Sequence, residues 1–279
     1  MDMNSRRQAD FSVLMSLYIG EKAEYFEACM QSLMAQTVLP GEILIVLDGP
    51  VSPELSACLD GWRERCPELI RITGYEKNRG LGYALSVGVE NCRYDLIARM
   101  DTDDIAAPER FEKQLAEFER DPGLQICGSC IDEFEETPSK VVAVRSVPLD
   151  EAGIRAYQRR RDAFNHMTVM YRRQAVLAAG NYQPCPLMED TYLWVRMLAM
   201  RVKCKNLPDC LVHARIGRGM YRRRGGLRYF MTYRAGRRRV LSTGYISYWD
   251  YLVTLAVQFV VCIMPGGLRG WVFKHLLHR

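Results

Sequence analysis

The sequence lacks several features that would each indicate a particular class of protein. Its ten cysteines do not follow the regular spacing of a secreted disulfide framework. The single CxxC pair, Cys127 and Cys130, has no second pair at zinc-site spacing. No long apolar run follows the basic residues near the amino terminus, so we expect no signal peptide. These absences favour a protein of the reduced cytosol.

Acidic residues are scarce near the carboxyl end. From Arg215 onward, twelve arginines and one lysine stand against one acid, Asp250, a net charge of +12. Residues 1–214 carry 25 Lys and Arg against 32 Asp and Glu, a net charge of −7. A basic tail on a mildly acidic body indicates an anionic partner: nucleic acid, lipid headgroups or a phosphorylated substrate.

The apolar segment within this tail, 251–264, is shorter than the roughly 20 residues that a membrane-spanning helix needs. Aromatic residues at 248, 249 and 251 are typical of a segment lying at a membrane interface. The segment therefore favours a helix resting on a membrane surface. The alternative is a buried carboxyl-terminal helix that packs on the rest of the protein.

Strands and helices are expected to alternate through the first hundred residues. Continuous apolar runs at 11–18, 42–48, 69–75 and 94–101 predict strands buried on both faces of a parallel sheet. The segments between them carry apolar residues at helical spacing, for example Phe26, Met30 and Leu33. This alternation predicts an α/β fold, a mixed and mainly parallel sheet with helices on both faces.

The predicted strands end in polar or aromatic residues. They end at Tyr18, at Asp48, just before Lys77–Gly80, and in "MDTDD" at 100–104. Ligands of open α/β sheets bind at the carboxyl ends of strands, so these groups predict one site. The crowded acids Asp101 and Asp103 suit a hard cation, Mg²⁺ or Mn²⁺, which would stabilise a departing diphosphate. The alternative is that Asp103 or Asp104 caps a helix that starts near Pro108.

The second half continues the alternation less regularly. We expect a helix from Pro108 to near Pro122, strands at 124–134 and 166–173, and a short helix to Gly180. The segment "MEDTYLWVRMLAM" (188–200) predicts another helix, with Glu189 and Asp190 at its amino-terminal end.

These motifs resemble a known enzyme family. "FSVLMSLY", "ILIVLDGP", "KNRGLGYALSVGVENC", "MDTDD" and "MEDTYLWVRM" have the order and spacing of the inverting family 2 glycosyltransferases, over about residues 10–216. The resemblance implies a GT-A fold, a Rossmann-like fold that binds nucleotide-diphosphate sugars. The tail resembles a bacterial subset that builds exopolysaccharide and O-antigen, amylovoran-type enzymes among them.

The resemblance also implies roles for single residues. Asp103 would ligate the metal, with Asp101 beside it or near the ribose. Asp190 would be the catalytic base that deprotonates the acceptor hydroxyl, with Glu189 in reserve. The donor-binding residues would be Tyr18, Asp48, Asn78, Arg79, Gly80, Asp101, Asp103 and Arg215. The family's usual Asp-Asp-Gly-Ser reads Leu47-Asp48-Gly49-Pro50 here, which leaves the nucleotide base open.

The sequence thus predicts a catalytic domain at 1–215, with a nucleotide-sugar half (10–104) and an acceptor half (105–215), followed by a helical, membrane-associating extension at 216–279. The expected activity is metal-dependent, inverting transfer of a hexose or similar sugar from a nucleotide-diphosphate donor, a UDP-sugar, to a polyprenyl-diphosphate-linked saccharide. The expected location is the cytoplasmic face of a bacterial inner membrane. The alternative is a non-enzymatic RNA- or membrane-binding module that uses the basic tail, although no nucleic acid is expected as a partner.

Overall fold

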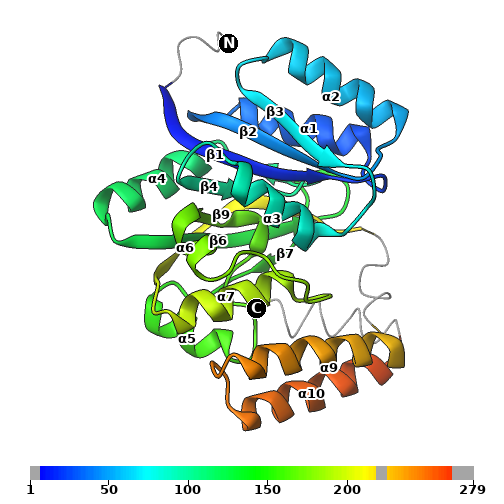
Figure 1. Ribbon diagram of the computed structural model, residues 1–279, viewed down its shortest axis with the longest axis vertical. Helices are drawn as coiled ribbons and strands as arrows, with labels where there is room; N and C mark the ends of the chain where they lie inside the picture. Colours follow the sequence, from blue (N-terminus) through cyan, green and yellow to red (C-terminus); the bar gives the residue numbers. More distant parts are fainter. Residues whose placement is uncertain (1–6, 218–224, 266–279) are drawn as a thin grey trace.

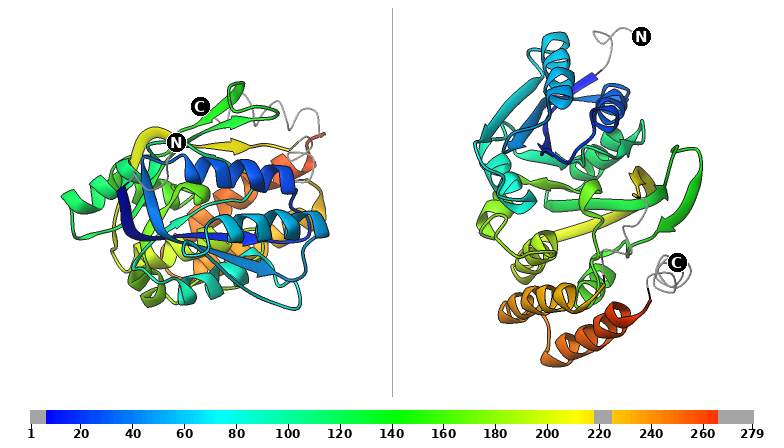
Figure 2. Two further views of the ribbon diagram at one scale, coloured as in Figure 1. Left: turned by 90° about the horizontal axis from the view of Figure 1, so that it is seen from above. Right: turned by 90° about the vertical axis from the view of Figure 1, so that its right-hand side faces the viewer.

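The computed structural model describes residues 7–217 and 225–265 (Figures 1 and 2). Its strands are β1 (Arg7–Leu17), β2 (Val38–Asp48), β3 (Ile70–Tyr75), β4 (Leu96–Arg99), β5 (Ile105–Ala106), β6 (Leu124–Phe134), β7 (Val141–Arg145), β8 (Met170–Arg172) and β9 (Lys203–Arg215). Its helices are α1 (Ala23–Met34), α2 (Pro53–Arg65), α3 (Leu81–Asn91), α4 (Arg110–Arg120), α5 (Glu151–Gln158), α6 (Arg173–Ala178), α7 (Glu189–Ala199), α9 (Leu227–Ser242) and α10 (Tyr248–Ile263), with a 3₁₀ turn at His166–Thr168.

The strands form one mixed sheet in the order β3-β2-β1-β4-β8-β6-β9-β5, with β7 beside β6. The half built from β1 to β4 is parallel, as predicted, because helices connect its strands. In the other half only β6 and β9 are parallel, and β8, β5 and β7 pair antiparallel. The prediction of a mixed, mainly parallel sheet is confirmed, because the antiparallel pairings of β8, β5 and β7 are short. The short turn between β6 and β7 permits only an antiparallel pair.

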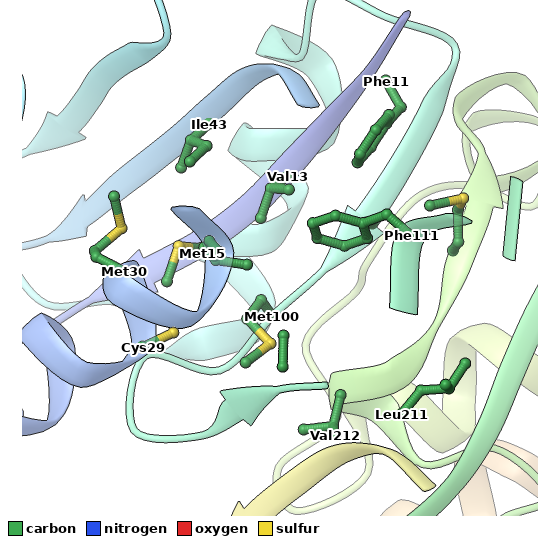
Figure 3. Close-up of a cluster of buried hydrophobic side chains, with 14 of the residues drawn as sticks. Phe11, Val13, Met15, Cys29, Met30, Ile43, Met100, Phe111, Leu211 and Val212 are labelled. Atoms are coloured by element: carbon green, nitrogen blue, oxygen red, sulfur yellow. The ribbon is translucent and has the colours of Figure 1, made fainter. Parts of the chain in front are cut away.

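Both faces of the sheet are buried at its strands β1 and β2, which explains their continuous apolar runs. Val13 and Met15 lie on one face in a cluster with α1, α2 and α4, shown in Figure 3. Leu14, between them in the sequence, lies on the other face in a cluster with α3, α6 and α7. Successive side chains of a strand point to opposite faces, so a strand covered on both sides needs apolar residues throughout.

Three sequence predictions fail at element ends. The strand expected at 94–101 stops at Arg99, which leaves Asp101 in the loop beyond it. The strand expected at 166–173 is a 3₁₀ turn followed by the short β8. The helix expected from Pro108 begins at Arg110, and Asp104 does not cap it, because no side chain caps this helix.

Helices α9 and α10 form a hairpin at the end of the molecule opposite β3 (Figures 1 and 2). The hairpin packs on α7, where Val240, Ile246 and Tyr251 meet Val195. The predicted extension is therefore helical, and one side of it is packed on the catalytic body. Of the predicted segment 216–279, residues 218–224 and 266–279 lie outside the part of the chain that the structure describes.

A buried acid fastens this hairpin. Asp250 accepts hydrogen bonds from Arg159 (2.9 and 2.7 Å) and Arg160 (2.7 Å), just after α5, and forms a capping box with Ser247. Burial alone would raise its pKa, but the hydrogen bonds from Ser247, Arg159 and Arg160 outweigh burial and hold the pKa of Asp250 well below its usual range. In the part of the chain described, no helix is both long enough and apolar enough to cross a membrane.

Candidate active site

The parallel half of the sheet brings the predicted donor-site residues to one edge. Strands β1, β2, β3 and β4 are neighbours, so their carboxyl ends lie side by side. Tyr18 directly follows β1 and its side chain is 42% exposed. Asp48 ends β2 and is buried, and Asp101 and Asp103, beyond β4, are partly exposed. The edge thus offers an exposed aromatic ring and two accessible carboxylates.

Asp48 organises the loop after β3. Its carboxylate accepts hydrogen bonds from the backbone N–H groups of Arg79 (2.7 Å) and Gly80 (2.9 Å) and from the Tyr75 hydroxyl (2.8 Å). Asn78 donates from its side chain to the Asp48 carbonyl oxygen (3.1 Å). The structure therefore shows Asp48 bound to its own chain, and its predicted contact with the nucleotide stays a prediction.

Two features of this loop depend on glycine. Gly49 has a φ of 81°, and a Cβ atom there would lie 2.6 Å from the backbone nitrogen of Asn78. Gly80 has a φ of 89° and precedes the first turn of α3. Both conformations are left-handed, which other residues rarely adopt. The guanidinium of Arg79 lies 3.4 Å from the Tyr83 ring centroid, which holds it at the site edge.

A buried arginine lies within the acidic loop. Arg99 is 1% exposed, and its Nη1 is 2.5 Å from Oδ2 of Asp101. Asp104 is also buried, and it accepts a hydrogen bond from the backbone N–H of Arg215 (2.8 Å). The three acids of "DTDD" therefore differ: Asp101 pairs with Arg99, Asp104 joins this loop to β9, and Asp103 is partly exposed.

Arg215 is tied to the same loop. Its Nε donates to the carbonyl oxygen of Asp103 (3.0 Å), and its guanidinium stacks on the rings of Tyr25 (4.0 Å) and Phe134 (4.6 Å). The structure brings this residue, more than a hundred positions away in sequence, beside Asp103 at the edge where the donor is predicted to bind. Whether it contacts a donor stays a prediction.

Glu21 is a site residue that the sequence analysis missed. Burial and the carboxylates of Asp103 and Asp101 raise its pKa to about 7. Burial and Asp101 likewise raise the pKa of Asp103 to about 6. The sequence signal that could have identified Glu21 is its position, three residues after Tyr18 in the turn that follows a predicted strand.

The electrostatics of this cluster fit a bound cation. The carboxylates of Asp101 and Asp103 disfavour the ionised form of Glu21, and that of Asp101 disfavours the ionised form of Asp103, whereas the positive charges of Arg99 and Arg215 favour the ionised form of Asp103. Carboxylate oxygens are the ligands that Mg²⁺ and Mn²⁺ prefer. Within residues 7–217 and 225–265, no three acidic, His or Cys side chains form a complete metal-binding group. A metal here would need further ligands, as Mg²⁺ sites completed by substrate phosphates do.

The predicted base lies at the start of α7. Asp190 is partly exposed, and its Oδ1 accepts a hydrogen bond from the backbone N–H of Thr191 (2.8 Å). Burial, then Asp162 and Glu189, raise the pKa of Asp190 to about 7. Burial also raises the pKa of Glu189, whose side chain lies against Gly82 of α3.

Arg99 connects the two groups of acids. Its positive charge lowers the pKa of Asp190 as well as those of Asp103, Asp104 and Glu21. Such effects require proximity, because the interaction of charges falls off with distance. The acidic loop and Asp190, some ninety residues apart in sequence, therefore lie around one buried guanidinium. This arrangement can hold an anionic donor at one end and accept a proton at the other.

Solved structures identify the fold. The mannosyltransferase PcManGT of Pyrobaculum calidifontis, solved with GDP-Man and Mn²⁺, superposes with a TM-score of 0.62 over 99% of this chain and 72% of that one, at 13% identity. S. aureus TarS 1–349, solved with UDP-GlcNAc, gives a TM-score of 0.62 over 96% and 73%, at 15% identity. The fold is that of the GT-A glycosyltransferases.

Sequence comparisons identify the family. The family model "Glycosyl transferase family 2" matches residues 12–179. The chain is 42% identical over 268 residues to the amylovoran biosynthesis glycosyltransferase AmsE of Erwinia amylovora, covering 95% of this chain and 98% of that protein. It is 39% identical over 277 residues to an uncharacterized glycosyltransferase of Haemophilus influenzae, covering 96% and 99%.

A third relative has a more specific name. The chain is 33% identical over 269 residues to the Escherichia coli UDP-Gal:alpha-D-GlcNAc-diphosphoundecaprenol beta-1,3-galactosyltransferase, covering 96% of this chain and 97% of that protein. Together, the family model and these relatives show that the chain belongs to glycosyltransferase family 2. This membership favours the enzyme over the non-enzymatic alternative.

Proposed function

We propose that the protein transfers a sugar, a hexose or similar, from a UDP-sugar to a saccharide carried on polyprenyl diphosphate, in the synthesis of a bacterial surface polysaccharide. The names of the relatives from Erwinia amylovora and Escherichia coli support this substrate class. The observation that carries the proposal is the position of Asp190, a partly exposed carboxylate near the same buried guanidinium as the acidic loop.

The proposed reaction inverts the anomeric carbon. The Asp190 carboxylate takes the proton of the acceptor hydroxyl while that oxygen bonds to the anomeric carbon, and the bond from that carbon to the diphosphate oxygen breaks on the opposite face. The proton ends on Asp190 and the electron pair on the departing diphosphate. A carboxylate whose pKa is near 7 matches this task, because about half of it is ionised at neutral pH and its ionised form is more basic than that of an ordinary carboxylate. Glu189 is the reserve base.

Other residues of the chain would hold the donor. Tyr18 offers an exposed ring for the nucleotide base, and the loop from Asn78 to Gly80 would lie beside the nucleotide. Arg215 would face the diphosphate, for which a planar guanidinium is suited. Asp103, with Asp101, would hold Mn²⁺ or Mg²⁺. When bound, such an ion supplies Lewis-acid stabilisation of the negative charge on the leaving diphosphate.

Donor binding gives a direct test of this function. We expect UDP-sugars with Mn²⁺ to raise the melting temperature of the protein, because a ligand of the folded state stabilises it by mass action. We also expect release of UDP when GlcNAc-diphosphoryl lipid is added as acceptor. A protein that binds no nucleotide-sugar and releases no nucleotide with any lipid-linked acceptor would contradict the proposal.

The outer side of α10 is the proposed membrane contact. Trp249 is 66% exposed, Val257 56% and Ile263 65%, although the other side of the helix packs on α9 and α7. Exposed arginines on α9, Arg234 and Arg238, complement anionic lipid headgroups. This placement supports a protein resting on the cytoplasmic face of the inner membrane.

Vesicle flotation tests this contact. We expect the wild type to float with phosphatidylglycerol-containing vesicles, and the triple variant with Trp249, Val257 and Ile263 changed to Gln to stay unbound. Val141→Gln, on an exposed side chain of β7, is the matched control and should float. If the triple variant floats as the wild type does, the contact lies elsewhere.

A further inference from the structure

Asp162 is a second carboxylate beside the proposed base. It lies in the turn that follows α5, partly exposed, and its Oδ1 accepts a hydrogen bond from the Thr191 hydroxyl (2.7 Å). Thr191 also donates its backbone N–H to Oδ1 of Asp190 (2.8 Å). One buried residue thus joins the two carboxylates. Gln158, fully buried, donates a further hydrogen bond to Oδ1 of Asp162 (3.2 Å).

Charged and titratable groups surround this pair on several elements. Glu189 adjoins Asp190 on α7, Arg99 acts from β4, and Tyr182 faces Asp190 from the segment after α6. Tyr233, on α9, lies within electrostatic range of both Asp162 and Arg237. The negative charges of Asp162 and Glu189 therefore oppose the positive charge of Arg99 at the base.

We propose that Asp162 is a positioning residue for Asp190, which holds the base through Thr191 and places a second negative charge beside it. This inference rests on the proposed function, in which Asp190 is the base. The consequence is that Asp162 makes the base stronger: without that neighbouring charge, Asp190 gives up its proton at lower pH.

The variant Asp162→Asn removes the negative charge of this side chain and keeps its shape. Asparagine has nearly the same size and its amide oxygen can still accept from Thr191 and Gln158, so the turn keeps its hydrogen bonds. We expect the acid limb of the pH profile of kcat/KM to move down by about one pH unit, the scale of a nearby like charge. The KM for the UDP-sugar should stay within a factor of about two, because the Asp162 carboxylate accepts its hydrogen bonds from Thr191 and Gln158, on the base side of the site.

Controls make the result specific. Asp209→Asn removes a surface carboxylate paired with Lys113 (2.6 Å) and should leave the limb in place. Asp162→Ser also removes the charge and serves if the asparagine variant does not fold. If a folded variant without the Asp162 charge keeps the acid limb of the kcat/KM profile at the wild-type pH, the inference is overturned.

A double-mutant cycle tests the same interaction without activity. At pH 8, Asp162→Asn should raise the melting temperature by about 3 °C more in the wild type than in the Asp190→Asn background, because that background lacks the Asp190 charge that Asp162 repels. Equal changes in both backgrounds overturn the inference. Turnover by Asp190→Asn refutes the proposed base itself, so the two failures are distinguishable.

Discussion

Replacing Asp190 by Asn should remove turnover and raise stability at the same time. Asn has nearly the same volume, and its side-chain oxygen can accept the hydrogen bond from the Thr191 backbone that Asp190 accepts now. The change removes the negative charge that would take the acceptor proton. General-base catalysis contributes about 10²–10⁴ in rate, so we expect kcat to fall by that factor with little change in donor affinity.

The stability gain follows from the raised pKa of Asp190. The folded protein holds the proton up to about pH 7, whereas the unfolded chain releases it near the ordinary value of 3.8. The folded state therefore binds more protons between these values, and the free energy of unfolding falls as the pH rises from about 4 to 7. Above pH 7 the wild type carries the full cost of an ionised Asp190, and the neutral Asn variant carries none.

The size of that cost can be bounded. At 1.36 kcal/mol per pKa unit, the shift from 3.8 to about 7 corresponds to about 4 kcal/mol. Asp190 is partly exposed and solvent screens its charge, so we expect about half of that, ~2 kcal/mol. For a protein of this size, ~2 kcal/mol corresponds to a rise of roughly 4–8 °C in the melting temperature.

Two measurements check the prediction. UDP release with a lipid-linked acceptor gives turnover, and thermal unfolding at pH 8.5 and pH 4 gives the pH-dependent difference, which should be large at pH 8.5 and small at pH 4. Asp209→Asn, on the surface, is the control for both. A variant that keeps more than a tenth of the wild-type kcat, or that melts below the wild type at pH 8.5, would refute the reasoning.

Other changes probe the donor edge and the hairpin. Asp103→Asn should abolish the melting-temperature shift produced by UDP-sugar with Mn²⁺ while the free protein stays folded, and a retained shift would contradict its role as ligand. Arg99→Met should lower the free energy of unfolding in urea by about 3 kcal/mol, since it leaves Asp101 without its buried partner; a loss below 1 kcal/mol would show that the pair adds little. Gly236→Leu should destabilise by about 1–3 kcal/mol, because a Cβ there would lie 2.9 Å from the Met188 sulfur; chemical denaturation measures the loss, and an unchanged midpoint would mean that the Met188 side chain or α9 moves aside at little cost.

The parallel half of the fold could be predicted because its signals are local. The central strands β1 and β2 are covered on both faces, so their sequences are apolar over most of their length, as Val13 and Leu14 on opposite faces of β1 illustrate. The parallel connections then place the strand ends at one edge, which is why Tyr18 and Asp101 could be expected together. The ends of elements were harder to predict, because a loop such as 100–104 can continue the apolar pattern of a strand by one or two residues.

The charge balance of the site could not be read from the sequence. The acidic loop suggested an external cation, but the partner of Asp101 is Arg99, two residues earlier in an apolar run. Nothing local shows that this arginine is buried or that its charge reaches Asp190. Glu21 and Asp162 lie in loops, and only the packing of distant segments brings them beside Asp103 and Asp190.

One side of α10 packs on the rest of the protein and the other side is exposed, where the membrane contact is proposed, and this decides how that contact should be tested. Helical spacing cannot show which side of α10 is covered. The structure packs Tyr251 toward α7 and leaves Trp249 exposed. A truncation at residue 246 would remove Tyr251 and Asp250 together, which would uncover Val195 and leave Arg159 without its acid. Loss of membrane binding by such a truncation could therefore follow from unfolding near the base helix, whereas exposed-side substitutions alter only the proposed contact.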